Sequence, residues 1–372
     1  MTDDRTAPDR VASRGRITWL DNARGIGIVL VVLGHAVAPG YVRDILYAFH
    51  MPLFFFLAGV TATAAASTPW PRQVHRYAHS LLIPFAVFGL MSLACIELVA
   101  LHRGAPPHWQ SLLLGVGSIA YGVAEWMPVN SVLWFFPALF VTACGSLLLV
   151  KLVGRMWALT IAALAGTAVI LLAPLLAPLP VRLPWSADSA VVASMFFLGG
   201  LQFGPPRKLP AAGHDSGTRR AVLAILSLLF LLTTAAIAKV NGFVNINELR
   251  FGNPLLYLLG SVLGTAGIIG LSVLLPASRG LRLLSRESRT IFPLHILVFS
   301  GVSMLVGAAA HWPNPEAVLR ARGWIVPLHL VFGLTLPIVF AWIVRRRAAW
   351  LLGEGGPRRR PAASGPRLAW QH

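Results

Sequence analysis

The sequence predicts an all-α membrane protein, a polytopic helix bundle that crosses the bilayer about ten times. Of its 372 residues, 56% are hydrophobic and only 12% are charged, and the apolar residues fall into long runs. Soluble domains carry about 25% charged residues. Half that supply leaves too little polar surface for a folded body in water, so lipid must be the solvent. The same composition excludes intrinsic disorder, because so many apolar side chains force burial.

Ten apolar stretches have roughly the 20 residues that a helix needs to cross a hydrocarbon core of about 30 Å. They are 17–38, 45–66, 80–101, 130–150, 157–178, 186–204, 221–238, 254–275, 290–310 and 324–344. A shorter run, 111–124, has the length of a re-entrant or interfacial segment, and we place it in a long outer loop, 102–129. The first stretch resembles a secretory signal, but nine further stretches favour a retained helix.

The positive charges predict that both termini are cytoplasmic, because cytoplasmic loops retain Lys and Arg during insertion. With this orientation the inner segments hold 23 of the 31 Lys and Arg residues and the outer loops hold seven. We therefore expect a cytoplasmic segment 1–16, a transmembrane domain 17–344, and a basic, disordered cytoplasmic tail 345–372. The protein is expected to be multi-pass in the inner (plasma) membrane, in contact with its lipids.

The net charge of +18 does not indicate nucleic acid as a partner. The basic residues are spread over short loops and the tail, whereas a nucleic-acid binder groups them on one face with interleaved aromatic residues. No metal-ligand spacing such as HExxH occurs, so we expect no metal site. The two cysteines, Cys95 and Cys144, lie inside apolar runs and form no CxxC pair.

The first stretch carries three ionisable residues, Asp21, Arg24 and His35. Each costs about 2.5 to 3.5 kcal/mol inside a membrane helix, so such groups point to function. At about 100° per residue, Arg24 and His35 project from the same helix face, about 16 Å apart along the axis. They are too distant to touch, and they would address two parts of a long ligand or two steps of one process. The structural alternative is a helix-end ion pair of Asp21 with Arg24.

Four further residues are candidates for binding substrate or donor: His50, Glu97, Trp134 and His295. His35 ends one stretch and His50 begins the next, so both can face one outer vestibule. A histidine can take and return a proton near neutral pH, as activation of a hydroxyl requires. Glu97 is expected either at the same outer cavity or solvated among the headgroups. Trp134 is expected at the outer side, where it belongs to an interfacial belt or stacks on a sugar. His295, early in its stretch, is expected near the inner face.

Two blocks of the sequence resemble the integral-membrane acyltransferase-3 family. The run LDNARG at 20–25, followed by His35, matches the Arg-x10-His signature of that family. The run FHMPLFFFLAG at 49–59 is similar to a segment of its fucose 4-O-acetylase-like branch, with Ala58 where Ser is usual. Weaker similarities lie at 133–140, 196–199 and 288–295, the last with Phe292 where the family often has Tyr.

The resemblance implies transfer of an acyl group, commonly acetyl from cytoplasmic acetyl-CoA, to a hydroxyl of a glycan or glycosylated metabolite. Arg24 and the basic loops would hold the phosphates of the donor, and Asp21 would orient Arg24. His35 would either deprotonate the acceptor or carry the acyl group itself. No permanently bound cofactor is expected, because acyl-CoA is a substrate. The alternatives are an ion-coupled transporter or lipid-linked glycan flippase, which also needs buried charges, and a membrane sensor or scaffold.

Overall fold

The computed structural model describes residues 17–63, 67–102, 104–105, 108–127, 130–177, 182–204, 217–312 and 314–354. The expected cytoplasmic segment 1–16 and the end of the expected tail lie outside these residues. Within them the chain is built from helices, and its single extended pairing is a bridge between Asn245 and Arg250. The predicted all-α class is confirmed.

Most of the helices are long enough to run through the bundle, and short 3-10 and π segments join several of them. In chain order they are α2 (Thr18–Ala36), α3 (Tyr41–Ala62), α4 (Trp70–Tyr77), η2 (Ala78–Leu82), α5 (Ile83–His102), α6 (Trp109–Tyr121), η3 (Ala124–Trp126), η4 (Ser131–Trp134), α7 (Phe135–Val153), α8 (Arg155–Leu176), η5 (Pro184–Ser186), α9 (Ala187–Phe203), α10 (Gly217–Asn241), α11 (Pro254–Leu274), α12 (Arg279–Ala310), α13 (Pro315–Ala321), α14 (Ile325–Ala348) and η6 (Ala349–Leu352).

In the described part of the chain, eight helical segments are long and apolar enough to cross a membrane. Each of the ten predicted stretches coincides with a helix, but α2 and α9 are not among the eight. Helix α9 has only 17 residues, and α2 carries Asp21 and Arg24. Both are shielded by protein, because α2 packs on α12, α14, α11 and α3, while α9 packs on α3, α8 and α7.

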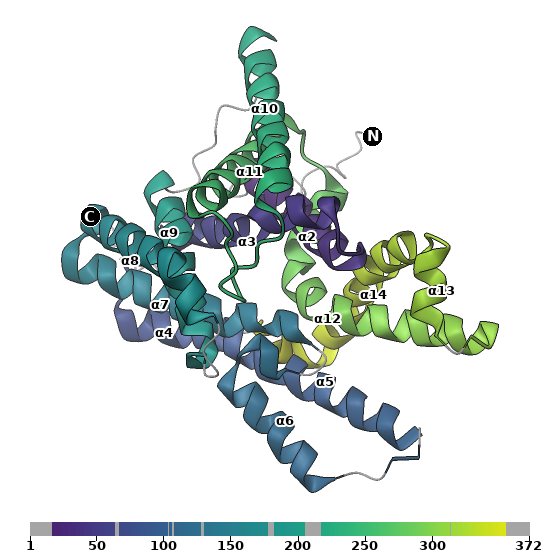
Figure 1. Ribbon diagram of the computed structural model, residues 1–372. Coiled ribbons are helices and arrows are strands. Elements are labelled where there is room, and N and C mark those ends of the chain that lie inside the picture. Colours follow the sequence, from purple (N-terminus) through teal and green to yellow (C-terminus); the bar gives the residue numbers. More distant parts are fainter. Residues whose placement is uncertain are drawn as a thin grey trace, which may run out of the picture.

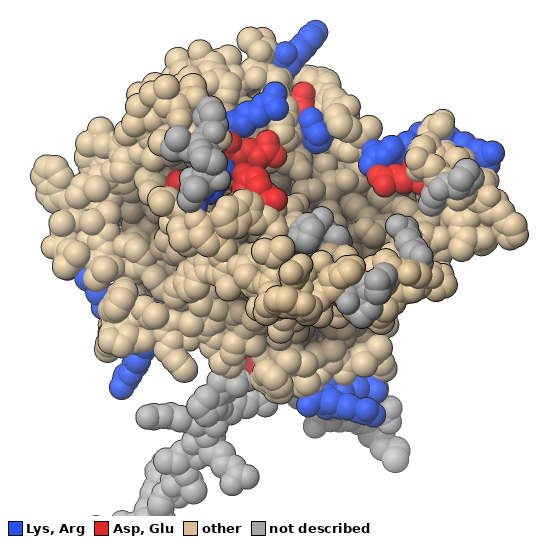
Figure 2. All heavy atoms as spheres, turned by 60° about the horizontal axis from the view of Figure 1, so that its bottom comes forward, with Lys and Arg blue, Asp and Glu red and all other residues tan. Residues whose placement is uncertain are grey.

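Figure 1 shows α2 and α3 near the centre, with α10, the α5 and α6 pair, and the helices α12 to α14 projecting around them. Small residues allow the close contacts in the middle. A Cβ atom on Gly59 would overlap the carbonyl of Phe197, and one on Gly200 would overlap the carbonyl of Phe56, so no larger residue fits between α3 and α9. Figure 2 shows wide uncharged areas between a few groups of charged side chains, as expected for a surface that meets lipid.

Several helix boundaries differ from those predicted by hydropathy. Helix α12 begins at Arg279, eleven residues before the expected stretch 290–310, because Ser278 caps it by accepting from the Leu281 amide at 3.3 Å. Residues 109–121 form helix α6 within the expected loop 102–129, ended by Gly122 with φ of 69°. The chain remains helical to Leu352, beyond the expected boundary at 345, because Arg345 pairs with the buried Glu287 of α12.

Candidate active site

A cavity of about 550 Å³ opens among α2, α3, α4, α7 and α12, and we call it the Arg24 cavity. Its lining is strongly basic, with one carboxylate and several hydroxyl groups. The charged lining residues are Asp21, Arg24, Arg76, Arg282, Arg286 and Arg289. A concentration of guanidinium groups is suited to a ligand that carries several phosphates.

Arg24 is held in this cavity by the neighbouring helix. Its Nη2 donates to Oγ1 of Thr61 on α3 at 3.1 Å, while Oδ1 of Asp21 accepts from the hydroxyl of Ser285 on α12 at 3.0 Å. Asn22, between them, donates to the carbonyls of Ser272, Leu275 and Pro276. Among the described residues, the contacts of Asp21 and Arg24 therefore run to neighbouring helices and replace the ion pair that their spacing favoured.

A second cavity, of about 340 Å³, lies at the other end of α2, and we call it the His35 cavity. It combines imidazole, aromatic, amide and carboxylate groups. The polar and aromatic lining residues are His35, Arg43, Tyr47, His50, Glu125, Ser131, Trp134, Phe243, Asn245, Asn247, Glu248 and Phe292. Such a mixture suits a ligand rich in hydroxyl groups, because each hydroxyl can both donate and accept.

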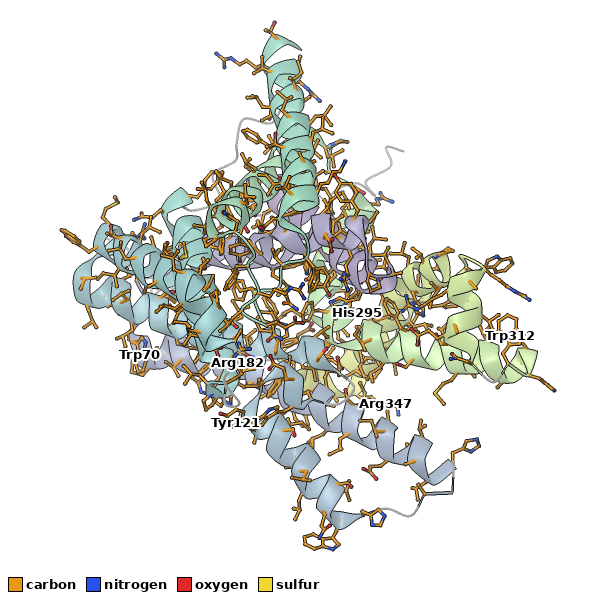
Figure 3. All side chains as sticks on the ribbon, viewed as in Figure 1. Trp70, Tyr121, Arg182, His295, Trp312 and Arg347 are labelled. Carbon is orange, nitrogen blue, oxygen red and sulfur yellow. The ribbon has the colours of Figure 1, made fainter. Side chains whose placement is uncertain are left out.

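Three histidines meet around this cavity, from α2, α3 and α12. The rings of His35 and His295 are 5.1 Å apart between centroids. Tyr47 lies beside His35, with its hydroxyl 3.2 Å from Nδ1, and its ring is 4.7 Å from that of His50. In Figure 3, His295 lies near the centre of the molecule, at the meeting of α2 and α12.

Hydrogen bonds fix the tautomers of two of these histidines. Nδ1 of His50 is 2.6 Å from the Leu46 carbonyl, and Nδ1 of His295 is 2.7 Å from the Phe292 carbonyl. A carbonyl oxygen only accepts, so both Nδ1 atoms carry the proton and both Nε2 atoms are free to accept one. Nε2 of His295 is buried, and among the residues that the structure describes it has no hydrogen-bond partner.

The two cavities meet at Phe292, which lines both. Arg24 and His35 therefore project from one helix into adjoining cavities of different chemistry, one basic and one rich in neutral hydrogen-bonding groups. The stretch of α2 between them is about 16 Å long. A ligand that reaches both residues would therefore be long, with its charged end near Arg24 and its reacting end near His35.

A comparison with models of protein families identifies the family to which the chain belongs. The model of a family described as an acyltransferase domain matches residues 17–346, nearly the whole described chain. The chain belongs to the acyltransferase-3 family. The acyltransferase is thus a multi-pass membrane enzyme, as the sequence predicted. Comparisons with curated proteins and with solved structures gave no match.

Two of the predicted site residues of the acyltransferase line neither cavity. His295 was expected near the inner face, yet it touches His35 at the other end of α2. The early start of α12 explains this, because His295 lies sixteen residues, or about 24 Å, along that helix. Glu97 was expected either at the outer cavity or solvated among the headgroups; it lines neither cavity and is partly exposed. It lies in the far half of α5, which pairs with α6 where Leu93 packs on Gly115.

The other predicted residues of the acyltransferase lie in the two cavities. Arg24 and Asp21 line the first, and His35, His50 and Trp134 line the second. Trp134 is buried, whereas Trp126 is exposed and stacks on Tyr121 at 4.4 Å. Within the described residues, no group of three His, Cys, Asp or Glu side chains is placed to hold a metal ion.

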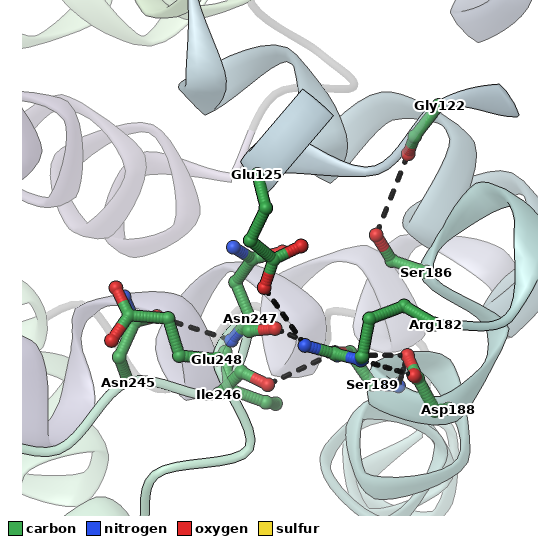
Figure 4. Close-up of polar contacts among 10 residues, drawn as sticks. All are labelled: Gly122, Glu125, Arg182, Ser186, Asp188, Ser189, Asn245, Ile246, Asn247 and Glu248. Carbon is green, nitrogen blue, oxygen red and sulfur yellow. Dashed lines mark hydrogen bonds and ion pairs between the residues drawn. The ribbon is translucent and has the colours of Figure 1, made fainter. Parts of the chain in front are cut away.

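Arg182 is a residue of the acyltransferase that the sequence did not single out. Its guanidinium donates to Asp188 at 2.6 and 3.1 Å, to Glu125 at 2.9 Å and to the Asn247 carbonyl at 2.8 Å (Figure 4). Burial alone would lower the pKa of Arg182, but the hydrogen bonds and charge of Asp188 and the charge of Glu125 raise it above its ordinary value. Because Glu125 and Asn247 line the His35 cavity, Arg182 fixes one wall of it.

Proposed function

We propose that the acyltransferase moves an acyl group from acyl-CoA to a hydroxyl of a glycan or glycosylated metabolite, and that this acyl group is acetyl. The donor occupies the Arg24 cavity and the acceptor occupies the His35 cavity. The observation that carries the proposal is the meeting of these two cavities at Phe292, with Arg24 in one and His35 in the other.

The donor side of the proposal rests on charge. Five arginines line the Arg24 cavity, and the phosphates of CoA are the part of the donor that such a lining would bind. A hydrogen bond to Thr61 orients the Arg24 guanidinium, so Arg24 can position the donor as well as attract it. Positive loops favour the cytoplasm, and we therefore assign this cavity to the cytoplasmic face of the inner (plasma) membrane.

The acceptor side rests on hydrogen-bonding capacity. Asn245, Glu248 and Ser131 offer groups that sugar hydroxyls can bind, and Trp134 and Phe243 offer faces on which a sugar ring can stack. The volume of about 340 Å³ is suited to one or two sugar rings rather than to a long chain.

The transfer itself needs one base. In our proposal Nε2 of His35 takes the proton of the acceptor hydroxyl while its Nδ1–H donates to the oxygen of Tyr47. The hydroxyl oxygen attacks the thioester carbonyl, the carbon–sulfur bond breaks, and the histidine returns the proton to the CoA thiolate. An ester and free CoA result. His295 would accept a hydrogen bond from a second hydroxyl of the acceptor and so hold the acceptor beside His35.

Direct transfer is favoured over an acyl-histidine intermediate by the crowding around His35. The Tyr47 hydroxyl lies against Nδ1 of His35, and the His295 ring lies 5.1 Å from the His35 ring between centroids, which leaves little space for an acyl group on the imidazole. A carrier function would require a ligand to pass from one cavity to the other, and the Phe292 ring lies where they meet.

The test is CoA release by the purified protein in liposomes, with radiolabelled acetyl-CoA and a panel of glycans. We expect label on a glycan, and a loss of at least about 100-fold in kcat for His35→Ala. His102→Ala, at an exposed position on α5, is the matched control and should keep wild-type kcat. Accumulation of unmodified glycan inside the vesicles without CoA release would contradict the proposal and support a carrier.

A further inference from the structure

Phe292 lies between the two cavities, where the proposed donor and acceptor would have to meet. It lines both cavities, and its side chain is buried with 6% exposure. Its ring centroid lies 5.0 Å from that of Phe135, 6.0 Å from that of Phe136 and 6.1 Å from that of His295. Three aromatic rings from α7 and α12 thus form the wall between the basic cavity and the histidines.

A wall at this point has a chemical consequence if the proposed function holds. The thioester on one side must meet an acceptor hydroxyl beside a base on the other. Water that reached the thioester beside the same base would take the place of the acceptor, giving a carboxylate and free CoA. The enzyme therefore needs an apolar group between the cavities that excludes water when the donor is bound and the acceptor is not.

We propose that the Phe292 ring is this group: a positioning residue that separates the thioester from water and limits the acyl groups that can reach His35. The inference rests on the proposed function. Because the ring packs on Phe135 and Phe136, it would restrict the acyl group to a short one, and a smaller side chain at 292 would admit longer ones.

The backbone around Phe292 is held independently of its ring. Its carbonyl accepts from Nδ1 of His295, and the next carbonyl, that of Pro293, accepts from the Asn130 amide at 2.8 Å. Asn130 also donates to the hydroxyl of Ser92 at 2.9 Å. A change of the side chain at 292 therefore keeps the hydrogen bonds that orient His295, and its effect on the reaction can be separated from an effect on that base.

The experiment compares Phe292→Leu, Phe292→Val and Phe292→Ala in liposomes. For each variant the ratio of acceptor-independent CoA release to acceptor-dependent transfer is measured, because this ratio does not depend on the amount of folded enzyme. We expect the ratio to rise in the order Leu, Val, Ala, by about tenfold for Ala. Butyryl-CoA should become a better donor relative to acetyl-CoA in the same order.

Phe88→Ala is the matched control. Phe88 is also a buried phenylalanine, it packs on Phe340, and it lines neither cavity. Its loss should lower the melting temperature, because it leaves a cavity in the core, without changing the ratio.

The outcomes separate two failures. A wild type that transfers acyl groups, with the same ratio and chain-length preference in all three Phe292 variants, would overturn the role of Phe292 alone. If Phe292→Ala fails to fold, the Leu and Val variants decide the question. A wild type that releases no CoA with any acyl donor would overturn the proposed function, and the role of Phe292 with it.

Discussion

The imidazoles of His35 and His295 lie 5.1 Å apart between ring centroids, although they come from α2 and α12, 260 positions apart in the sequence. The orientation of His295 is fixed by the Phe292 carbonyl, and its Nε2 has no partner in the described part of the chain. His295 is therefore placed to accept a hydrogen bond from an acceptor that is bound beside His35.

His295→Gln should lower kcat by about tenfold, because glutamine lacks the Nδ1–H that the Phe292 carbonyl fixes, so its acceptor atom is no longer oriented toward the acceptor. The KM for the acyl donor should change little, since His295 does not line the Arg24 cavity. The measurement is steady-state kinetics with both substrates varied. His311→Gln, at an exposed position, serves as control. Unchanged kcat in His295→Gln would remove this residue from the reaction.

Tyr47→Phe should lower kcat about tenfold with little loss of stability. The change removes the hydroxyl that contacts Nδ1 of His35 at 3.2 Å, and one hydrogen bond contributes about 1 kcal/mol. The ring, which packs on His50 and on Phe243, is kept. Kinetics and a thermal melt of the same preparation check both parts. A variant with full activity would show that Tyr47 does not orient His35.

Arg182→Gln should cost about 3 to 5 kcal/mol of stability, because it leaves Asp188 without its partner at a site where both side chains are largely buried. The double variant Arg182→Gln with Asp188→Asn should recover part of that loss. Acceptor KM should rise in both, since the wall that holds Glu125 and Asn247 loosens. A fluorescence melt in detergent measures the stability. A melting temperature unchanged in the single variant would contradict the structural role of Arg182.

Glu354→Gln tests a second ion cluster, at the end of α14. The hydrogen bond from Arg345 lowers the pKa of Glu354 below its ordinary value of 4.5. Its charged form therefore stabilises the fold above that ordinary value, and this contribution is lost as the pH falls through the lowered pKa. The melting temperature of Glu354→Gln should lie below that of the wild type at neutral pH and converge with it in acid.

Glu316→Gln is the control for that experiment. Its ion pair with Arg320 is on the exposed face of α13, and such pairs contribute little. The control variant should follow the wild type at every pH. A difference between wild type and Glu354→Gln that grows as the pH falls would contradict the prediction.

The shared face of Arg24 and His35 could be predicted from sequence because both lie on one regular helix, where periodicity fixes direction. The placement of His295 could not, since it depends on where α12 begins. Hydropathy marks only the apolar part of that helix, and its first turns carry Arg279, Arg282 and Arg286. The Ser278 cap was the available signal for the true start.

The wall of the His35 cavity that Arg182 stabilises could not be predicted from the sequence either. Its partners Glu125, Asp188 and Asn247 come from three separate segments that only the folded bundle brings together. Charged loop residues without a periodic pattern give no direction to a side chain. The fold class and number of apolar stretches, by contrast, follow from composition and run length, which are properties of the chain alone.

The central claim is that the acyl group passes from the Arg24 cavity to the His35 cavity, and a sided transfer assay tests it most directly. Proteoliposomes with uniformly oriented enzyme would receive labelled acetyl-CoA on the face that carries the basic loops, with a membrane-impermeant glycan acceptor trapped inside. The account predicts acylated glycan in the lumen, and its loss in His35→Ala and Arg24→Gln. Acylation that occurs only when donor and acceptor share one side of the membrane would contradict it.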